Sequence, residues 1–292
     1  MNMLIKHLQY LIGKAFADVP DFWEKVKVEF EKLENAKSFW SEVYVAKLES
    51  DLVEVPKEVF IKIPRPTENV GRVETIDKDT IMQVLRNYVK RESNFYKLLN
   101  NREIPHFPTS HIYHIEKILG DGTGGMVAES LVGQVHAIDF LPGLNDEQVL
   151  RLIEALAGFH SFSKKMFTEK DFALFSEGVI YRKTAADIVR VLTLGTSRKE
   201  RKANTERYLK HYYTTLERLS EHGNAPFSFE ELKEQYTMIF PIVSNFTLFG
   251  IGVYYKMYSD GSLGKQEMKE ENLKELLDRA EGIVEDIENS IV

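Results

Sequence analysis

The order of repeating patterns along the chain constrains its fold more than any other feature. Before about residue 134, short β-like runs dominate and are bounded by Pro, Gly, Asn and Asp. After residue 144, apolar side chains recur at three- and four-residue steps, which predicts helices almost throughout. We therefore predict an α+β protein with a β-rich N-terminal lobe over residues 1–133 and a helical C-terminal lobe over residues 134–292. A cleft is expected where the two lobes meet.

The N-terminal lobe is predicted to contain several strands and one long helix. The β-like runs cover residues 38–48, 58–63, 110–119 and 125–133. The long helix is predicted over residues 78–100, and its inward stripe comprises Ile81, Val84, Leu85, Tyr88, Glu92, Phe95 and Leu99. Glu92 therefore lies among apolar side chains on the face that is expected to be buried.

The C-terminal lobe carries start signals for two of its helices. Asn145 and Thr184 are the predicted N-caps, because their side chains can accept hydrogen bonds from the first turn of a helix. Further helices are predicted at about 198–221, 228–258 with a break, and 265–290. Residues 239–257 are long enough to span a membrane, but Pro241 and polar residues dilute the segment. We predict a buried helix or helix pair there.

Composition excludes several classes of function. A chain of 292 residues with 43% hydrophobic content can bury a full core. The net charge of -7 argues against a nucleic-acid or anionic-membrane partner, since both favour clustered Lys and Arg. Cysteine is absent, which excludes disulfides and thiolate-bound metals. Lys6 and His7 interrupt the apolar N-terminus, so it reads as an amphipathic helix rather than a signal peptide, and a cytoplasmic location is expected.

Two charged residues in apolar surroundings form the first candidate site. Lys62 lies in the predicted strand "EVFIKI", and Glu92 lies on the buried stripe of the following helix. A charge that is buried without a partner is costly, so the two side chains are expected to pair. A strand lysine paired with a helix glutamate is the arrangement with which kinase folds hold the phosphates of ATP. The alternative is a solvated lysine on an edge strand.

Several phrases, taken in order, identify a family resemblance. They are "VFIKIP" (59–64), "RESNFYKLL" (91–99), "IPHFP" (104–108), "GGMVAESLVG" (124–133), "EQVLRLIEALAGFHS" (147–161), "DIVRVLTLGTSRKERKANTERYLKHYYTTLERL" (187–219) and "FSFEELKEQYTMIFP" (227–241). Together they resemble the choline-kinase-like proteins that are abundant in nematodes. That group is related to insect ecdysteroid kinase-like proteins and, more distantly, to choline kinases and aminoglycoside phosphotransferases. The resemblance extends from about Phe39 to Val253.

The resemblance implies a bilobal protein-kinase-like fold and ATP as the cofactor. By resemblance, Lys62 contacts the ATP phosphates, Glu92 pairs with Lys62, and the backbone around Glu129, Ser130 and Leu131 meets adenine. The activity that the complete family implies is ATP-dependent phosphorylation of a hydroxyl group on a small molecule. The sequence does not identify that molecule.

The chain departs from the family where the chemistry would take place. Members carry an H-G-D-x-W-x-x-N-like catalytic loop and then an I-D-W-like metal strand, whose Asp and Asn residues position the hydroxyl and hold magnesium. Here only 26 residues, 161–186, separate His160 from Asp187, and they contain neither motif. The missing elements need at least about 50 residues. We therefore predict no catalytic residues, a lost Mg²⁺ site and an internal junction between about residues 175 and 184.

Short motifs elsewhere do not replace the missing loop. "DFA" (171–173) follows His160 too closely to be a metal strand and is predicted to be a helix cap with a buried Phe172. "HGN" (222–224) follows a long helix, so Gly223 is predicted to end that helix. "GDGTGG" (120–125) fits G-x-G-x-x-G, but a strand follows it rather than a helix, which favours a hairpin turn.

Three hypotheses follow from the sequence. The chain represents a small-molecule kinase that is incomplete here, through an alternative transcript or an omission in gene prediction. Alternatively, it is a pseudokinase that binds a nucleotide or a protein partner without transferring phosphate. In the third hypothesis it is a helical binding module. Asp187 bears on all three, since its expected partner in the catalytic loop is missing: it is either an exposed helix N-terminal charge or a buried acceptor.

Overall fold

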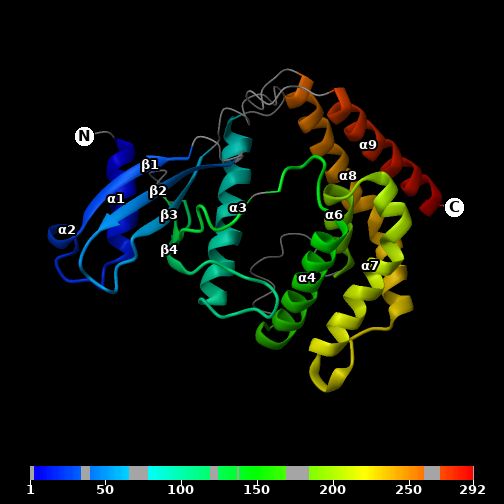
Figure 1. Cartoon of the computed structure of the whole chain (residues 1–292), viewed down its shortest axis with the longest axis horizontal. Helices are drawn as coiled ribbons and strands as arrows, with labels where there is room; N and C mark the ends of the chain where they lie inside the picture. The colour runs from blue at the N-terminus through cyan, green and yellow to red at the C-terminus, as the bar shows by residue number, and fades with distance from the viewer. Residues whose placement is uncertain are drawn as a thin grey trace. The chain divides into compact units, whose positions relative to one another are not determined.

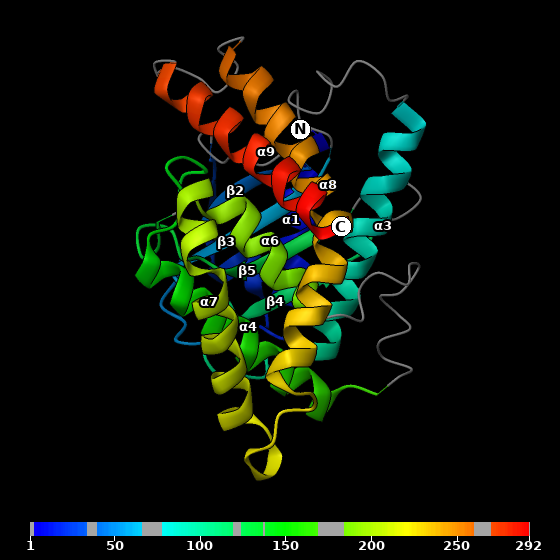
Figure 2. The same cartoon turned by 90° about the vertical axis from the view of Figure 1, so that its right-hand side faces the viewer.

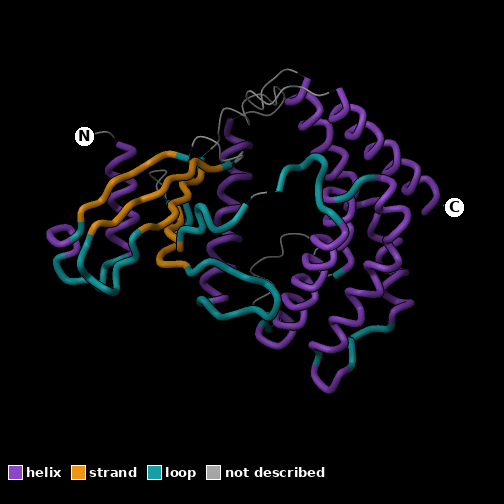
Figure 3. Tube along the Cα trace, in the orientation of Figure 1, coloured by secondary structure: helices purple, strands orange, loops and turns teal. Residues whose placement is uncertain are grey.

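A computed structural model describes most of the chain, in seven stretches. They are residues 3–33, 40–65, 78–118, 124–136, 138–168, 184–259 and 270–291. The chain divides into two compact units (Figures 1 and 3). Unit 1 consists mainly of residues 1–102 and 109–136, and unit 2 consists of residues 103–108 and most of the chain from residue 137 onward. The sequence placed the boundary between the lobes after residue 133.

Unit 1 is the β-rich part of the protein. Its elements are α1 (Met3–Ala15), α2 (Phe22–Lys25), β1 (Lys27–Lys32), β2 (Ser41–Glu49), β3 (Glu58–Pro64), α3 (Lys78–Leu99), β4 (Ile112–Glu116) and β5 (Gly125–Glu129). The strands form one antiparallel sheet in the order β1-β2-β3-β5-β4. Strand β3 therefore lies in the middle of the sheet, so the solvated edge-strand reading of Lys62 is wrong.

Alternation along β3 gives the sheet two different faces. Val59, Ile61 and Ile63 are buried and belong to a core that they share with Leu11 and other residues of α1. Because successive side chains of a strand point to opposite faces, Lys62 lies on the face away from this core. Helix α1 buries Leu8, Leu11 and Ile12 on one side, which confirms the amphipathic N-terminal helix that the sequence predicts.

The secondary-structure elements of unit 2, among its described residues, are helices joined by loops. It contains α4 (Asp146–Met166), α6 (Ala185–Gly195), α7 (Arg198–Leu219), a short 3₁₀ helix (Glu221–Gly223), α8 (Phe229–Ser259) and α9 (Glu270–Ile291) (Figure 2). Its core is built from apolar residues of all five α-helices, including Ile153, Val189, Tyr212, Val243 and Ile283. The combination of the two units confirms the predicted α+β fold class, with a sheet in the N-terminal part.

The helix starts agree only in part with the predicted caps. Asn145 accepts a hydrogen bond from the Gln148 backbone N–H, and the Gln148 side chain accepts one from the Asn145 N–H, which forms a complete capping box. Thr184 is the N-cap residue of α6, as predicted, but its side chain makes no capping hydrogen bond with a backbone N–H. The Thr184 hydroxyl is instead engaged by Tyr212.

Helix α8 runs without the predicted break, although Pro241 lies within it. Proline removes the hydrogen bond to the carbonyl four residues earlier, here that of Thr237, which lies on an exposed position where water can bond instead. By length and apolar composition α8 could cross a membrane. One side of the helix, including Ile239, Val243 and Ile251, belongs to the core of unit 2. Such burial is typical of the core helix of a globular unit.

Candidate functional site

The structure brings Lys62 and Glu92 together. The Lys62 ammonium lies 2.7 Å from Oε1 and 2.9 Å from Oε2 of Glu92, so it faces both carboxylate oxygens. Both side chains are partly buried, with exposed fractions of 28% and 30%. In the sheet, Lys62 pairs with Val43 on one side and Met126 on the other, which fixes its backbone within a three-strand ladder.

Helix α3 positions the glutamate. Its buried residues Ile81, Leu85, Val89 and Ser93 follow one another at four-residue steps, and Glu92 borders this stripe. Tyr88, which the sequence placed on the stripe, is exposed instead, and its ring contacts that of Trp40 at a centroid distance of 6.1 Å. Steps of three and of four residues both fit a helical period of 3.6, so the sequence could not decide between Tyr88 and Val89 as the buried residue. The structure buries Val89, four residues after Leu85.

The electrostatics of the pair suit a third, anionic partner. A lysine ammonium has three N–H donors, and two of them can serve the two oxygens of Glu92. The remaining donor is available to an anion such as a phosphate oxygen. Burial and, after it, the charge of Glu92 raise the pKa of Tyr96, one turn further along α3. Because water screens partly exposed pairs, the contact orients Lys62 more than it stabilises the fold, contributing about 1 kcal/mol or less.

The segment predicted to meet adenine begins at the end of β5. The Glu129 N–H donates to the His111 carbonyl at 2.8 Å, and the Ser130 hydroxyl donates to Glu58 Oε1 at 2.5 Å. The Leu131 carbonyl accepts the N–H of Gln134 at 3.0 Å, which closes a turn. Glu129 pairs with Val59 on β3, so the segment is three residues, or about 10 Å, along the ladder from Lys62. Its contact with adenine stays a prediction.

A second polar cluster lies in unit 2, where the sequence predicts that the catalytic loop is missing. His160 Nε2 is 3.3 Å from Asp187 Oδ2, and His160 Nδ1 is 2.8 Å from the Tyr212 hydroxyl. Arg190 Nη1 donates to Asp187 Oδ1 at 3.0 Å. Burial alone raises the pKa of Asp187, but the hydrogen bonds and charges of His160 and Arg190 outweigh it and lower the pKa below its ordinary value.

Asp187 lies in the first turn of α6, as the helix N-terminal charge of the first alternative does, and it is not a buried acceptor that lacks a partner. It is a partly exposed carboxylate that already has two partners on α4 and α6. This cluster was not predicted from the sequence. The three-residue spacing of Asp187 and Arg190 on one helix does predict their contact. Burial, followed by the charge of Asp187, raises the pKa of Tyr212 well above its ordinary value, so its hydroxyl stays protonated.

The remaining short motifs contribute no chemistry that the described residues support. The long helix α7 ends before Gly223, with Ser220 as its C-cap, so the predicted helix stop is wrong for α7. Gly223 instead ends the short 3₁₀ helix that follows, with a positive φ of 67°. Residues 171–173 and the predicted junction at 175–184 lie outside the described residues, apart from Thr184 itself. Within the described stretches, no three His, Asp or Glu side chains are grouped so that they could hold a metal ion.

Comparison with known proteins yields a family and a relative. A family profile, DUF1679, described as "Uncharacterized oxidoreductase dhs-27", matches residues 58–184 and 176–291. The chain is also 27% identical, over 382 aligned residues, to a Caenorhabditis elegans protein named "Uncharacterized kinase-like protein D1044.1". That alignment covers 98% of this chain and 100% of the relative. No solved structure matches the chain.

Both alignments are discontinuous or longer than this chain. The family profile matches in two separate segments that overlap at residues 176–184. The alignment with the relative has 382 positions and this chain has 292 residues, so at least 90 positions of the relative have no counterpart here. The overlap of the two family segments falls in the interval where the sequence predicts the internal junction.

Proposed function

The chain belongs to the DUF1679 family, and we propose that it is a kinase-like protein that binds a nucleotide through Lys62 without transferring its phosphate. The observation that carries the proposal is the contact of the Lys62 ammonium with both carboxylate oxygens of Glu92, at 2.7 and 2.9 Å. In kinase folds this pair must be in place for the lysine to reach the phosphates of ATP. ATP and ADP are therefore the proposed ligands.

The descriptions of the family and of the relative suggest different cofactors, and the site favours one of them. The family description names an oxidoreductase, whereas the relative is named kinase-like. A dinucleotide site needs a glycine-rich turn that opens a helix, so that the helix N-terminus meets the pyrophosphate. Here the G-x-G-x-x-G match at 120–125 runs into β5, a strand. The Lys62 and Glu92 pair has the kinase arrangement, so we propose an adenosine phosphate rather than a nicotinamide dinucleotide.

The lack of phosphoryl transfer is the second part of the proposal. Transfer requires a carboxylate that orients the attacking hydroxyl and side chains that hold magnesium against the developing charge. The sequence has neither an H-G-D nor an I-D-W motif between His160 and Asp187. The positions of the relative without a counterpart, at least 90, leave room for both elements. The proposed role is thus that of a pseudokinase, and the choline-kinase-like substrate class applies to complete members only.

Calorimetric titration of the full chain tests the nucleotide site. We expect ATP and ADP to bind, and we expect Lys62→Ala to weaken both by at least about tenfold, or ~1.4 kcal/mol, since the phosphate contact is lost. AMP and NADPH are expected to show no dependence on Lys62. Lys47→Ala is the matched control, because Lys47 lies on the neighbouring strand β2 and pairs with Glu31 in an exposed position.

Two results would overturn the proposal. One is equal nucleotide affinity in Lys62→Ala and Lys47→Ala, which would mean that any binding occurs elsewhere. The other is the absence of heat with every nucleotide, in a chain whose circular dichroism shows the expected helix content. The second result would leave a scaffold or helical binding module as the remaining role.

A further inference from the structure

A cavity in unit 2 lies apart from the residues discussed so far. It has a volume of about 260 Å³ and is formed by α7, α8 and α9. Its walls include Arg201 and Lys202 from α7, Tyr236, Thr237 and Phe240 from α8, and Asp286 from α9. Ligand pockets usually measure about 300–1,000 Å³, so this cavity suits a small molecule with one ring or a short chain.

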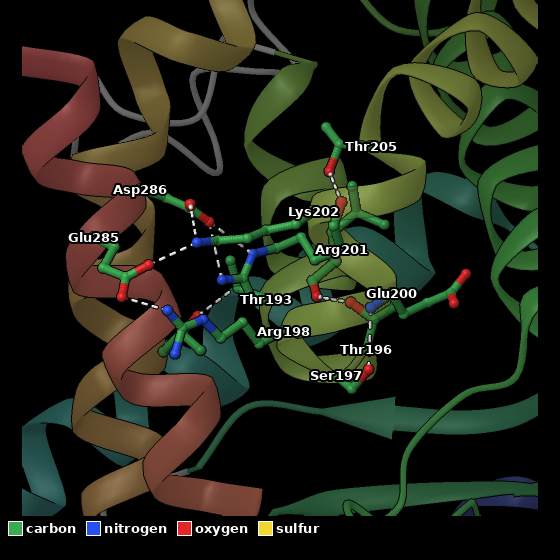
Figure 4. Close-up of polar contacts among 12 residues, drawn as sticks. Thr193, Thr196, Ser197, Arg198, Glu200, Arg201, Lys202, Thr205, Glu285 and Asp286 are labelled. Atoms are coloured by element: carbon green, nitrogen blue, oxygen red, sulfur yellow. Dashed lines mark hydrogen bonds and ion pairs between the residues drawn. The ribbon is translucent and has the colours of Figure 1, made fainter.

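Arg201 is the most unusual residue of the cavity wall. Its side chain is almost fully buried, with 1% exposure, and such burial of arginine normally requires complete pairing. Nε and Nη2 donate to Asp286 Oδ2 at 3.2 and 3.0 Å, as Figure 4 shows. Nη1 has no hydrogen-bond partner among the described residues. A buried N–H group without an acceptor is unfavourable, so an acceptor from the cavity would complete the guanidinium once the atoms that cover Nη1 move aside.

The charges of the wall indicate the sign of the missing group. Lys202 contributes a second positive charge, and its ammonium lies 2.6 Å from Glu285 and 3.9 Å from Asp286 (Figure 4). Among the described residues of the lining, two are positively charged and Asp286 is the carboxylate, while Glu285 contacts Lys202 from outside the lining. The rings of Tyr236 and Phe240 give the cavity an apolar side. An acceptor with negative charge and an apolar body matches both features.

We propose that this cavity binds a small carboxylic acid with an apolar tail. The carboxylate accepts from the Arg201 guanidinium and lies near the Lys202 ammonium, and the tail packs against Tyr236 and Phe240. Arginine is suited to this role because its planar donors match the geometry of a carboxylate. The cavity contains neither Lys62 nor Glu92, so carboxylate binding there is a proposal independent of nucleotide binding.

Benzoate is the probe, and its neutral isostere benzamide is the first control. Titration of the full chain at constant ionic strength is expected to give saturable benzoate binding that is at least about tenfold tighter than benzamide binding. Inorganic phosphate, which lacks an apolar body, is expected to bind more weakly than benzoate. Equal binding of benzoate and benzamide, or no benzoate binding, would mean that the cavity holds only water, and would overturn the proposal.

A variant of the cavity wall locates the binding without touching the Arg201–Asp286 pair. Thr237 is exposed at the wall, and its hydroxyl bonds the Lys233 carbonyl at 3.1 Å, so Thr237→Met adds bulk to the cavity without leaving a buried group unpaired. We expect benzoate affinity to fall at least about tenfold in this variant. Thr214→Met on α7 is the control, since its hydroxyl makes the same bond to the Lys210 carbonyl at 3.0 Å. Wild-type benzoate affinity in Thr237→Met would contradict the assignment.

Discussion

Gly158 illustrates how a single position in unit 2 is constrained by its neighbours. It lies inside α4, where glycine is a poor choice by helix propensity alone. A Cβ atom at this position would lie 1.8 Å from the Pro105 carbonyl oxygen, which is backbone and cannot swing aside. The close approach of α4 to the loop at residues 103–108 therefore requires glycine.

The first stability prediction compares two helical glycines. We expect Gly158→Ala to lower the free energy of unfolding by about 1–3 kcal/mol, because the methyl group overpacks the contact with Pro105. Gly250→Ala is the control in α8, where, beyond the adjacent backbone of the helix itself, no atom of the described residues lies within 4 Å of the added Cβ. Propensity then dominates, and Gly250→Ala should stabilise by up to about 1 kcal/mol. Urea unfolding measures both changes, and a stabilising Gly158→Ala would contradict the close contact.

At the residue scale, the sequence predicts contacts best where two patterns converge. Strand alternation around Lys62 and the helical stripe around Glu92 each limit the direction of one side chain, and their contact follows. No such pattern links Arg201 to Asp286 or His160 to Tyr212, because 85 and 52 residues separate the partners. Contacts of that kind depend on how helices pack, which the local periodicity of a sequence does not encode.

At the scale of elements, strong apolar periodicity made the long helices predictable. One strand was not predicted because most of its residues are charged. The sequence analysis missed β1, "KVEFEK", since only Val28 and Phe30 alternate with its charged residues. That composition suits an edge strand, where charged side chains discourage pairing with other chains. The predicted break in α8 failed for a different reason: packing of its buried face outweighs the local cost of Pro241.

Arg279 connects three elements of unit 2 and carries the next prediction. Its side chain is fully buried on α9 and donates to Glu275 at 2.7 Å and to the carbonyls of Phe140, Leu194 and Pro142. These carbonyls belong to the loop before α4 and to α6. We expect Arg279→Ala to cost about 3–5 kcal/mol, because it empties a fully buried site and leaves three carbonyls and the partly exposed carboxylate of Glu275 unpaired.

Lysine is not expected to rescue this position. A single ammonium group cannot reproduce the planar donors that reach four acceptors, so Arg279→Lys should lose most of the same stability. Lys274→Ala is the control on the same helix, where the Lys274 side chain is 73% exposed and pairs with Glu270, and it should cost about 0.5 kcal/mol or less. Chemical denaturation distinguishes the variants. An Arg279→Ala protein as stable as Lys274→Ala would show that the hydrogen bonds of Arg279 contribute little to stability.

At the scale of the whole molecule, the chain combines a Lys62–Glu92 contact with a sequence that lacks the H-G-D and I-D-W motifs. Unit 1 brings Lys62, on a strand of its five-stranded sheet, into contact with Glu92 on α3. In unit 2, α4 and α6 flank the interval in which the sequence lacks the catalytic motifs, and Asp187 has partners within the unit. The fold class was predictable from the order of patterns. The internal junction stays a prediction that rests on the family resemblance alone, since composition and periodicity do not indicate an omission.

The most direct test of the central claim is the dependence of ATP binding on magnesium. In an active kinase, Mg²⁺ bridges the phosphates and protein side chains, so its removal weakens ATP binding. For this chain we predict ATP affinities in Mg²⁺ and in EDTA that agree within about threefold, or ~0.7 kcal/mol, and no ADP formed with any hydroxyl acceptor. Magnesium that tightens ATP binding by more than about tenfold, or magnesium-dependent release of ADP, would contradict the account.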